Sequence, residues 1–185
     1  MKAALVAILF AAPALAQTSE PSRSPRDVAA AACGPKNVKF EVKQDTPPDP
    51  AQPTPGKALV YMIEDLGQCP DCVGLRGSLT DVADALTRVG MDGTWVGANQ
   101  GNSYFFFAVD PGEHHLCINW QSRLELRSHA FAMANFTAEE GKIYYFRERL
   151  FPGENDYFLD LDPVNSDQGK YLVAISAFST SRAKK

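Results

Sequence analysis

Two cysteines are the residues of this chain whose types and spacing most directly suggest chemistry. Cys69 and Cys72 form a C-x-x-C motif, with a strand-like run at residues 57–63 before it and a helix candidate at residues 78–89 after it. A helix that begins close behind such a pair lowers the pKa of its thiols and makes them reactive. Thiol–disulfide exchange by this pair is therefore the alternative function that we carry forward.

Other features of the sequence favour a structural role for the same pair. Gly74 and Gly77 separate the cysteines from Ser78, where we expect the helix to begin. The rest of the chain reads as consecutive strands, without the alternating helices that a thioredoxin-type fold needs. We therefore interpret the C-x-x-C pair first as a staple or a loop clip.

The cysteines as a set predict disulfides. The chain contains Cys33, Cys69, Cys72 and Cys117, an even number, and an export signal described below implies an oxidising compartment. Four cysteines allow three pairings, of which we favour Cys33–Cys117 and Cys69–Cys72. The first of these bonds would tie an extended N-terminal segment to a core strand.

A metal site at the histidines is the weaker interpretation of this region. His114, His115 and Cys117 could join Cys69 and Cys72 around zinc, which accepts nitrogen and sulfur ligands in a tetrahedron. The spacing matches no established zinc pattern, and a strand directs neighbouring histidines to opposite faces. We predict no metal here.

An acidic group near the C-terminus raises the question of calcium. It comprises Asp160, Asp162, Asn165 and Asp167. Pro163 and Val164 break the alternating ligand pattern of a calcium loop, so a solvated loop is the preferred interpretation. The sequence contains neither a nucleophile elbow nor a glycine-rich phosphate loop. We therefore predict no catalytic residues and no cofactor.

The N-terminus has the three parts of a secretory signal peptide. Lys2 supplies the positive charge, residues 3–12 form the apolar core, and Ala14-Leu15-Ala16 is a cleavage site. We expect cleavage between Ala16 and Gln17, and a periplasmic or extracellular mature protein. The apolar run is too short to span a bilayer, so no membrane span is expected after cleavage.

The charge balance argues against nucleic acid as a partner. The formal net charge is -4, and it becomes about -5 when Lys2 is removed with the signal peptide. Basic residues cluster only in the tail at residues 182–185. A nucleic-acid surface needs a larger basic patch than this.

Short apolar and aromatic runs separated by turn residues predict a mainly β fold. Asp92-Gly93 and Pro111-Gly112 are turn pairs, because glycine adopts the positive φ that tight turns require. We expect strands at residues 37–43, 58–63, 94–96, 104–109, 116–121, 142–149, 157–161 and 171–175, one long strand or two over residues 124–136, and one short helical insertion at residues 78–89. This pattern predicts an antiparallel β-sandwich.

The composition divides the chain into five parts. We expect a signal peptide at residues 1–16, a flexible N-terminal segment at 17–36, a strand with a proline-rich linker at 37–55, the β-sandwich domain at 56–178, and a flexible tail at 179–185.

Several turn and core segments together have the outline of a known family. They are Gly56-Lys57-Ala58-Leu59-Val60-Tyr61, Asp92-Gly93, Ser103-Tyr104-Phe105, Pro111-Gly112-Glu113-His114 and Gly141-Lys142-Ile143-Tyr144-Tyr145. The chain resembles a family of bacterial exported domains of unknown function (domain of unknown function 2846). It is also distantly similar to PEGA and transthyretin-like (prealbumin-like) β-sandwich modules. Over roughly residues 56–175 the resemblance implies an envelope β-sandwich without established catalytic residues; the C-x-x-C segment departs from it.

Aromatic residues are the remaining candidates for a binding surface. Most of Trp95, Tyr104, Phe105, Tyr144 and Tyr145 should lie in the core, and a minority on an exposed sheet face could stack on sugars or bind protein. Trp95, next to a turn, is the candidate that we single out. We therefore predict an exported, non-enzymatic β-sandwich that binds a protein or glycan partner of the cell envelope.

Overall fold

The structure is a computed structural model that describes residues 33–48, 51–65, 86–121, 130–152 and 157–184. Its elements, in chain order, are β1 (Phe40–Asp45), β2 (Ala58–Glu64), β3 (Leu86–Met91), β4 (Thr94–Gln100), β5 (Ser103–Val109), β6 (Gly112–Gln121), β7 (Phe131–Ala138), β8 (Ile143–Pro152), β9 (Tyr157–Val164), α3 (Ser166–Ile175) and β10 (Ala177–Ala183). The fold is mainly β, as the sequence predicted.

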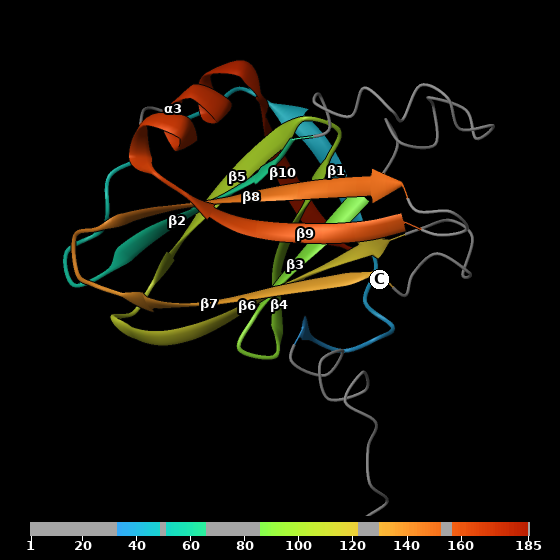
Figure 1. Ribbon diagram of the computed structural model, residues 1–185, viewed down its shortest axis with the longest axis horizontal. Coiled ribbons are helices and arrows are strands. Elements are labelled where there is room, and N and C mark those ends of the chain that lie inside the picture. The colour runs from blue at the N-terminus through green and yellow to red at the C-terminus, as the bar shows by residue number, and fades with distance from the viewer. Residues whose placement is uncertain (1–32, 49–50, 66–85, 122–129, 153–156, 185) are drawn as a thin grey trace, which may run out of the picture.

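Two sheets pack face to face as a sandwich (Figure 1). The large sheet has the strand order β1-β10-β5-β2-β8-β9, and the small sheet has the order β4-β3-β6-β7. Most strand pairs are antiparallel, as expected, but β2 pairs in parallel with β8 and β10 pairs in parallel with β5. These pairs join strands that are distant in the sequence, and local turn signals cannot reveal such pairing.

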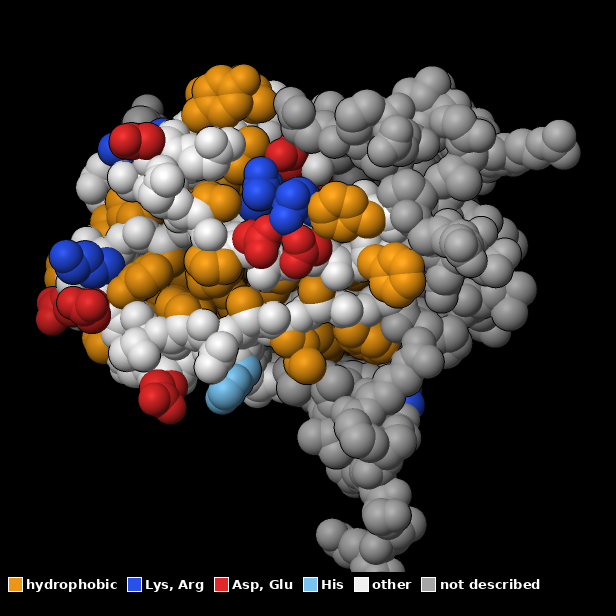
Figure 2. Space-filling model, in the orientation of Figure 1, with side chains coloured by type: hydrophobic (Ala, Val, Ile, Leu, Met, Phe, Trp, Pro, Cys, Tyr) orange, Lys and Arg blue, Asp and Glu red, His pale blue; other side chains and the backbone are white. Residues whose placement is uncertain are grey.

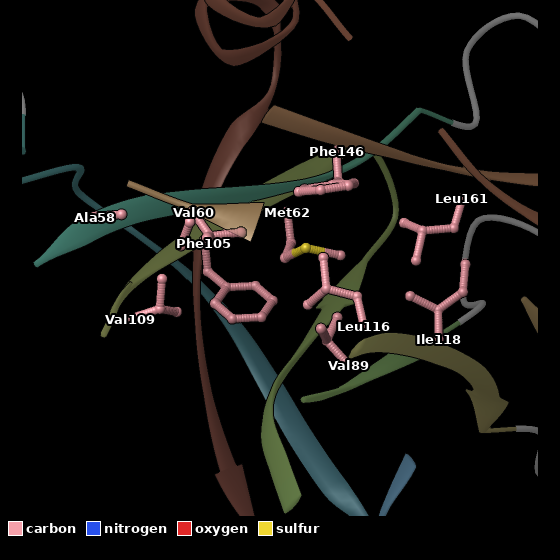
Figure 3. Packing of buried hydrophobic residues seen from close by; sticks show 11 residues of the cluster. Ala58, Val60, Met62, Val89, Phe105, Val109, Leu116, Ile118, Phe146 and Leu161 are labelled. Atoms are coloured by element: carbon pink, nitrogen blue, oxygen red, sulfur yellow. The ribbon is translucent and has the colours of Figure 1, made fainter. Parts of the chain in front are cut away.

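The main core lies between the two sheets (Figure 3). The inner face of the large sheet contributes Val60, Met62, Phe105 and Phe146, and the small sheet contributes Val89, Leu116 and Ile118. Met62 lies between Phe146 and Leu116 in this view. Alternate residues of each strand point inward, so the opposite face of the large sheet carries a second set of side chains.

A helix covers that second face. The helix α3 lies over the large sheet on the side away from the small sheet (Figure 1). Our prediction of a strand at residues 171–175 is wrong, because these residues complete α3. Asn165 caps the helix: its side chain accepts hydrogen bonds from the backbone N–H groups of Asp167 and Gln168. The cap overrides the β propensity of the apolar residues that follow.

Two further predictions need correction. The helix expected at residues 78–89 is wrong over residues 86–89, which belong to β3, while residues 78–85 lie outside the described residues. The expected tail at residues 179–185 is mostly strand, because β10 continues to Ala183 and pairs with β1. Since β1 is an edge strand of the large sheet, the sandwich begins before residue 56.

A disulfide fixes the N-terminal segment to the small sheet. Cys33 and Cys117 are bonded, as the sequence predicted, and both are buried. The backbone of Cys33 lies so close to Gly90 that an added Cβ on Gly90 would come 2.0 Å from the Cys33 carbonyl oxygen. Glycine at this position therefore permits the close approach of the segment.

Candidate functional site

An aromatic surface covers the outer face of the large sheet. Tyr61 on β2, Tyr104 and Phe106 on β5, and Tyr145 on β8 share this face. Strand pairing sets them side by side, since Tyr61 is in register with Tyr145 on one side and with Phe106 on the other. The rings of Tyr61 and Tyr145 stack with their centroids 5.0 Å apart.

A cavity of about 450 Å³ lies on this aromatic surface. Its floor is the four aromatic rings and Ile143, one wall is α3, and the other wall is the proline-rich segment before β2. The wall residues are Lys170, Val173 and Ala174 of the helix, and Pro47, Pro48, Ala51 and Gln52 of the segment. We call this space the aromatic cavity.

The helix stands unusually close to the cavity floor. Gly169 faces Tyr145, and a Cβ added to Gly169 would lie 2.2 Å from the Cγ of the tyrosine ring. Leu172 packs on the same aromatic surface. The helical wall is thus held against the floor at a fixed height, which gives the cavity a defined shape in the free protein.

The floor has polar groups as well as apolar rings. Tyr61, Tyr104 and Tyr145 are each less than a tenth exposed, and burial raises the pKa of all three hydroxyls, so they are neutral donors near neutral pH. Within the described ranges none of the three hydroxyls forms a hydrogen bond. Buried tyrosine hydroxyls usually find a partner, so these are available to a ligand.

The rim adds a positive charge. Lys170 is exposed on α3, and across the described part of the chain its ammonium group has neither an ion pair nor a hydrogen bond. Gln52 on the opposite wall supplies an amide that can donate and accept. The arrangement combines flat apolar faces, hydroxyls, an amide and the Lys170 ammonium group around a concave space.

Trp95, the aromatic residue that we singled out, lies half-buried on β4 next to the Asp92-Gly93 turn. Its indole nitrogen donates a hydrogen bond of 2.9 Å to the Pro35 carbonyl, and the Arg88 guanidinium lies 4.4 Å from the ring centroid. Gly34 also contacts the ring. The half-buried indole therefore anchors the N-terminal segment; it lies on the small sheet and does not line the aromatic cavity.

The two histidines do not form a metal site with Cys117, whose sulfur is in the disulfide. His114 is half-buried and bonded through Nδ1 to Asp92 at 2.7 Å, while His115 is exposed. Burial lowers the pKa of His114, but hydrogen bonds to Asp92 and to the Asp110 carbonyl outweigh burial and raise it overall. These contacts tie two neighbouring turns together.

The acidic group near the C-terminus also has other partners. Asp160 and Asp162 pair with Arg149, and Asp162 lies near Arg147 as well. Figure 2 shows these basic and acidic side chains gathered over β8 and β9. Asn165 is the helix cap. Among the described residues, no three or more histidine, cysteine or acidic side chains are grouped as metal ligands.

Several predicted residues lie outside the described residues. They are Cys69 and Cys72 of the C-x-x-C motif, and Ala16 and Gln17 at the expected cleavage site. In the described part of the chain, none of the helical structure is both long and apolar enough to span a bilayer.

The sequence revealed the cavity in part. Tyr104 and Tyr145 stood among the aromatic residues from which we expected a binding face, whereas Tyr61 and Phe106 were assigned only to strands. The alternation of Tyr104 and Phe106 was a usable signal, because residues two apart in a strand share a face. The helical wall was hidden by our assignment of residues 171–175 to a strand.

Comparisons of the chain with protein-family models, with curated proteins and with solved structures found no match. The resemblance described above therefore stays a prediction.

Proposed function

We propose that this protein is an exported, non-enzymatic binding module of the cell envelope, and that the aromatic cavity binds a glycan. The signal-peptide pattern supports export. The observation that carries the binding proposal is a cavity whose floor has three tyrosine hydroxyls free of hydrogen bonds within the described residues.

The chemistry of the cavity fits a sugar. Aromatic rings offer flat apolar surfaces on which the C–H face of a sugar ring can stack, and the tyrosine hydroxyls can bond its hydroxyl groups. Lys170 at the rim would favour a sugar that carries a carboxylate or a phosphate. A sugar has both an apolar C–H face and many hydroxyl groups, so it matches both features of the cavity.

The shape of the cavity favours a glycan over a folded protein partner. A volume of about 450 Å³ lies within the usual range of small-ligand pockets, and the space is concave rather than flat. A folded partner would need a much broader contact surface. An extended proline-rich peptide is the protein ligand that could enter, and the experiment below includes it.

A glycan array tests the proposal with a blocked cavity. We expect the mature protein to bind a subset of glycans and Ala174→Trp to lose that binding, because a large ring at the exposed Ala174 would fill the cavity mouth. Ile175→Trp is the matched control, since Ile175 is 58% exposed on the same helix and does not line the cavity. Titration calorimetry should show that Ala174→Trp binds the glycan at least tenfold more weakly, a loss of about 1.4 kcal/mol of binding free energy.

The outcomes separate the alternatives. Glycan binding that Ala174→Trp leaves intact would place the site elsewhere on the protein. Binding of a proline-rich peptide library without any glycan signal would show a protein ligand and contradict the glycan assignment. Equal loss in both tryptophan variants would point to damage to α3 rather than to a blocked cavity, and circular dichroism of the two variants checks this.

A further inference from the structure

Two glutamates lie side by side inside the sandwich, on the side of the large sheet opposite the aromatic cavity. Glu64 ends β2 and is in register with Glu148 on the parallel strand β8. Both are 1% exposed. Each follows its strand's inward-facing residue by two positions, Met62 and Phe146 respectively, so both carboxyl groups point between the sheets.

The two carboxyl groups bond across to the small sheet. The Thr87 hydroxyl on β3 donates to Glu64 Oε1 at 2.6 Å. The Asn99 amide on β4 donates to Glu148 Oε1 at 2.9 Å. The other oxygen of each carboxyl group, Oε2, is buried and has no hydrogen-bond partner.

The other polar groups bonded around the Glu64–Glu148 pair are neutral. The Asn99 side-chain oxygen accepts from the hydroxyls of Ser103 on β5 and Ser179 on β10, and its amide also donates to the Met62 carbonyl. Asn99 is thereby held in one orientation, with its NH₂ group toward Glu148. The pair therefore sits in a network that draws on six strands of both sheets.

No positive side chain of the described residues bonds to either carboxyl group. On β3, Arg88 points to the other face and bonds to the Val38 carbonyl and Asn119. On β8, Arg147 and Arg149 alternate with Phe146 and Glu148, so their side chains lie on the outer face of the sheet. Other charged groups on or beside these strands have partners elsewhere: Asp160 and Asp162 pair with Arg149, Glu41 pairs with Arg182 and Lys184, and Lys57 pairs with Asp110. Asp65, the residue after Glu64, is acidic.

Two buried carboxyl groups that have no counter-ion among the described residues cannot both be ionised cheaply. Burial removes the water that stabilises the charge, and the second negative charge repels the first. Burial accordingly raises the pKa of Glu64 from 4.5 to about 7. Burial, and then the charge of Glu64, raise the pKa of Glu148 well above 4.5.

We propose that protons bound to Glu64 and Glu148 hold the two sheets together at this end of the sandwich, and that their loss as the pH rises loosens the contact between the sheets. A protonated carboxyl group accepts the bonds from Thr87 and Asn99 without charge repulsion. Two ionised carboxyl groups would repel each other and move apart. The hydrogen bonds from Thr87 on β3 and Asn99 on β4 would then break.

The direction of the pH effect follows from linkage. The folded protein holds these protons more tightly than the unfolded chain does, so their stabilising effect is complete below about pH 4.5. It is lost as the pH rises through the folded-state pKa. For Glu64 alone, a rise from pH 5 to pH 8 should increase the unfolding equilibrium constant on the order of 100-fold.

The decisive experiment compares amide variants by urea unfolding between pH 5 and pH 9. Glu64→Gln with Glu148→Gln keeps the shape of the neutral pair at every pH, so this double variant should lose the 100-fold dependence and exceed the wild type in stability at pH 8. Glu113→Gln, at an exposed position on β6, is the matched control and should keep the wild-type dependence. His114 titrates in all three proteins and cancels in the comparison.

A second measurement needs no variant. In the wild type, the carboxyl carbon of Glu64 observed by NMR should titrate with a midpoint of about 7, and amides of β3 and β4 beside the pair should exchange faster above that pH than amides at the far end. A titration midpoint near 4.5 for Glu64 would overturn the proposal. So would parallel curves of unfolding free energy against pH for the wild type and the double variant. So would a pH dependence that calcium or magnesium chloride abolishes, because the pair would then hold a cation.

Discussion

Replacing Cys33 and Cys117 together by alanine is expected to lower the free energy of unfolding by about 4–5 kcal/mol. The bond closes a loop across 84 positions of the sequence. In the chain-entropy model, removing a cross-link of that span increases the entropy of the unfolded chain by this amount. Urea unfolding of the oxidised wild type and of the double variant measures the difference.

The same variant should release the N-terminal segment. Trp95 contacts Gly34 and bonds to the Pro35 carbonyl, so the loss of the anchor at residue 33 should expose the indole and shift its fluorescence to longer wavelength. Reduction of the wild type serves as the control and should reproduce both changes, while the double variant should respond little to reductant. A double variant as stable as the oxidised wild type would contradict the account.

Phe146→Ala is expected to lower the free energy of unfolding by about 3–5 kcal/mol, the usual loss of stability when a large buried aromatic side chain is removed. Phe146 is 1% exposed and packs in the middle of the inter-sheet core, with the Phe136 ring centroid 5.1 Å away. The variant leaves a cavity that rigid strands on both sides cannot close. Urea unfolding at constant pH is the measurement.

Phe158→Ala is the matched control for this prediction. Phe158 is also a strand phenylalanine, on β9 next to β8, but it is 61% exposed. Its removal should change the free energy of unfolding by less than about 0.5 kcal/mol. Comparable losses for the two variants would contradict the assignment of the core to the space between the sheets.

Turn chemistry explains why much of the fold could be predicted. Asp92 and Gly93 both have positive φ, 51° and 81°, as a two-residue hairpin turn between β3 and β4 requires. The sequence missed the helix α3 because Tyr171 to Ile175 have β propensity, although Asn165 was a readable capping signal. β10 was missed because it is a mostly polar strand held by its pairing with β1 and β5, and it has no apolar alternation to reveal it.

The candidate site was less predictable than the fold. The disulfide followed from the expected compartment and the cysteine count, whereas the contacts of Trp95 with Gly34 and Pro35 could not be predicted because they come from a segment distant in sequence. The aromatic cavity needs β2, β5 and β8 side by side with α3 above them. The Glu64–Glu148 pair likewise depends on one parallel strand pairing, which no local pattern specifies.

Chemical-shift mapping would test the proposed binding site most directly. The glycan that gives the strongest array signal is titrated into ¹⁵N-labelled protein, and amide shifts are followed by NMR. We predict that the largest shifts lie at Tyr61, Tyr145, Lys170 and Ala174, around the aromatic cavity. Shifts centred on Trp95 and the small sheet, with these four amides unmoved, would contradict the account.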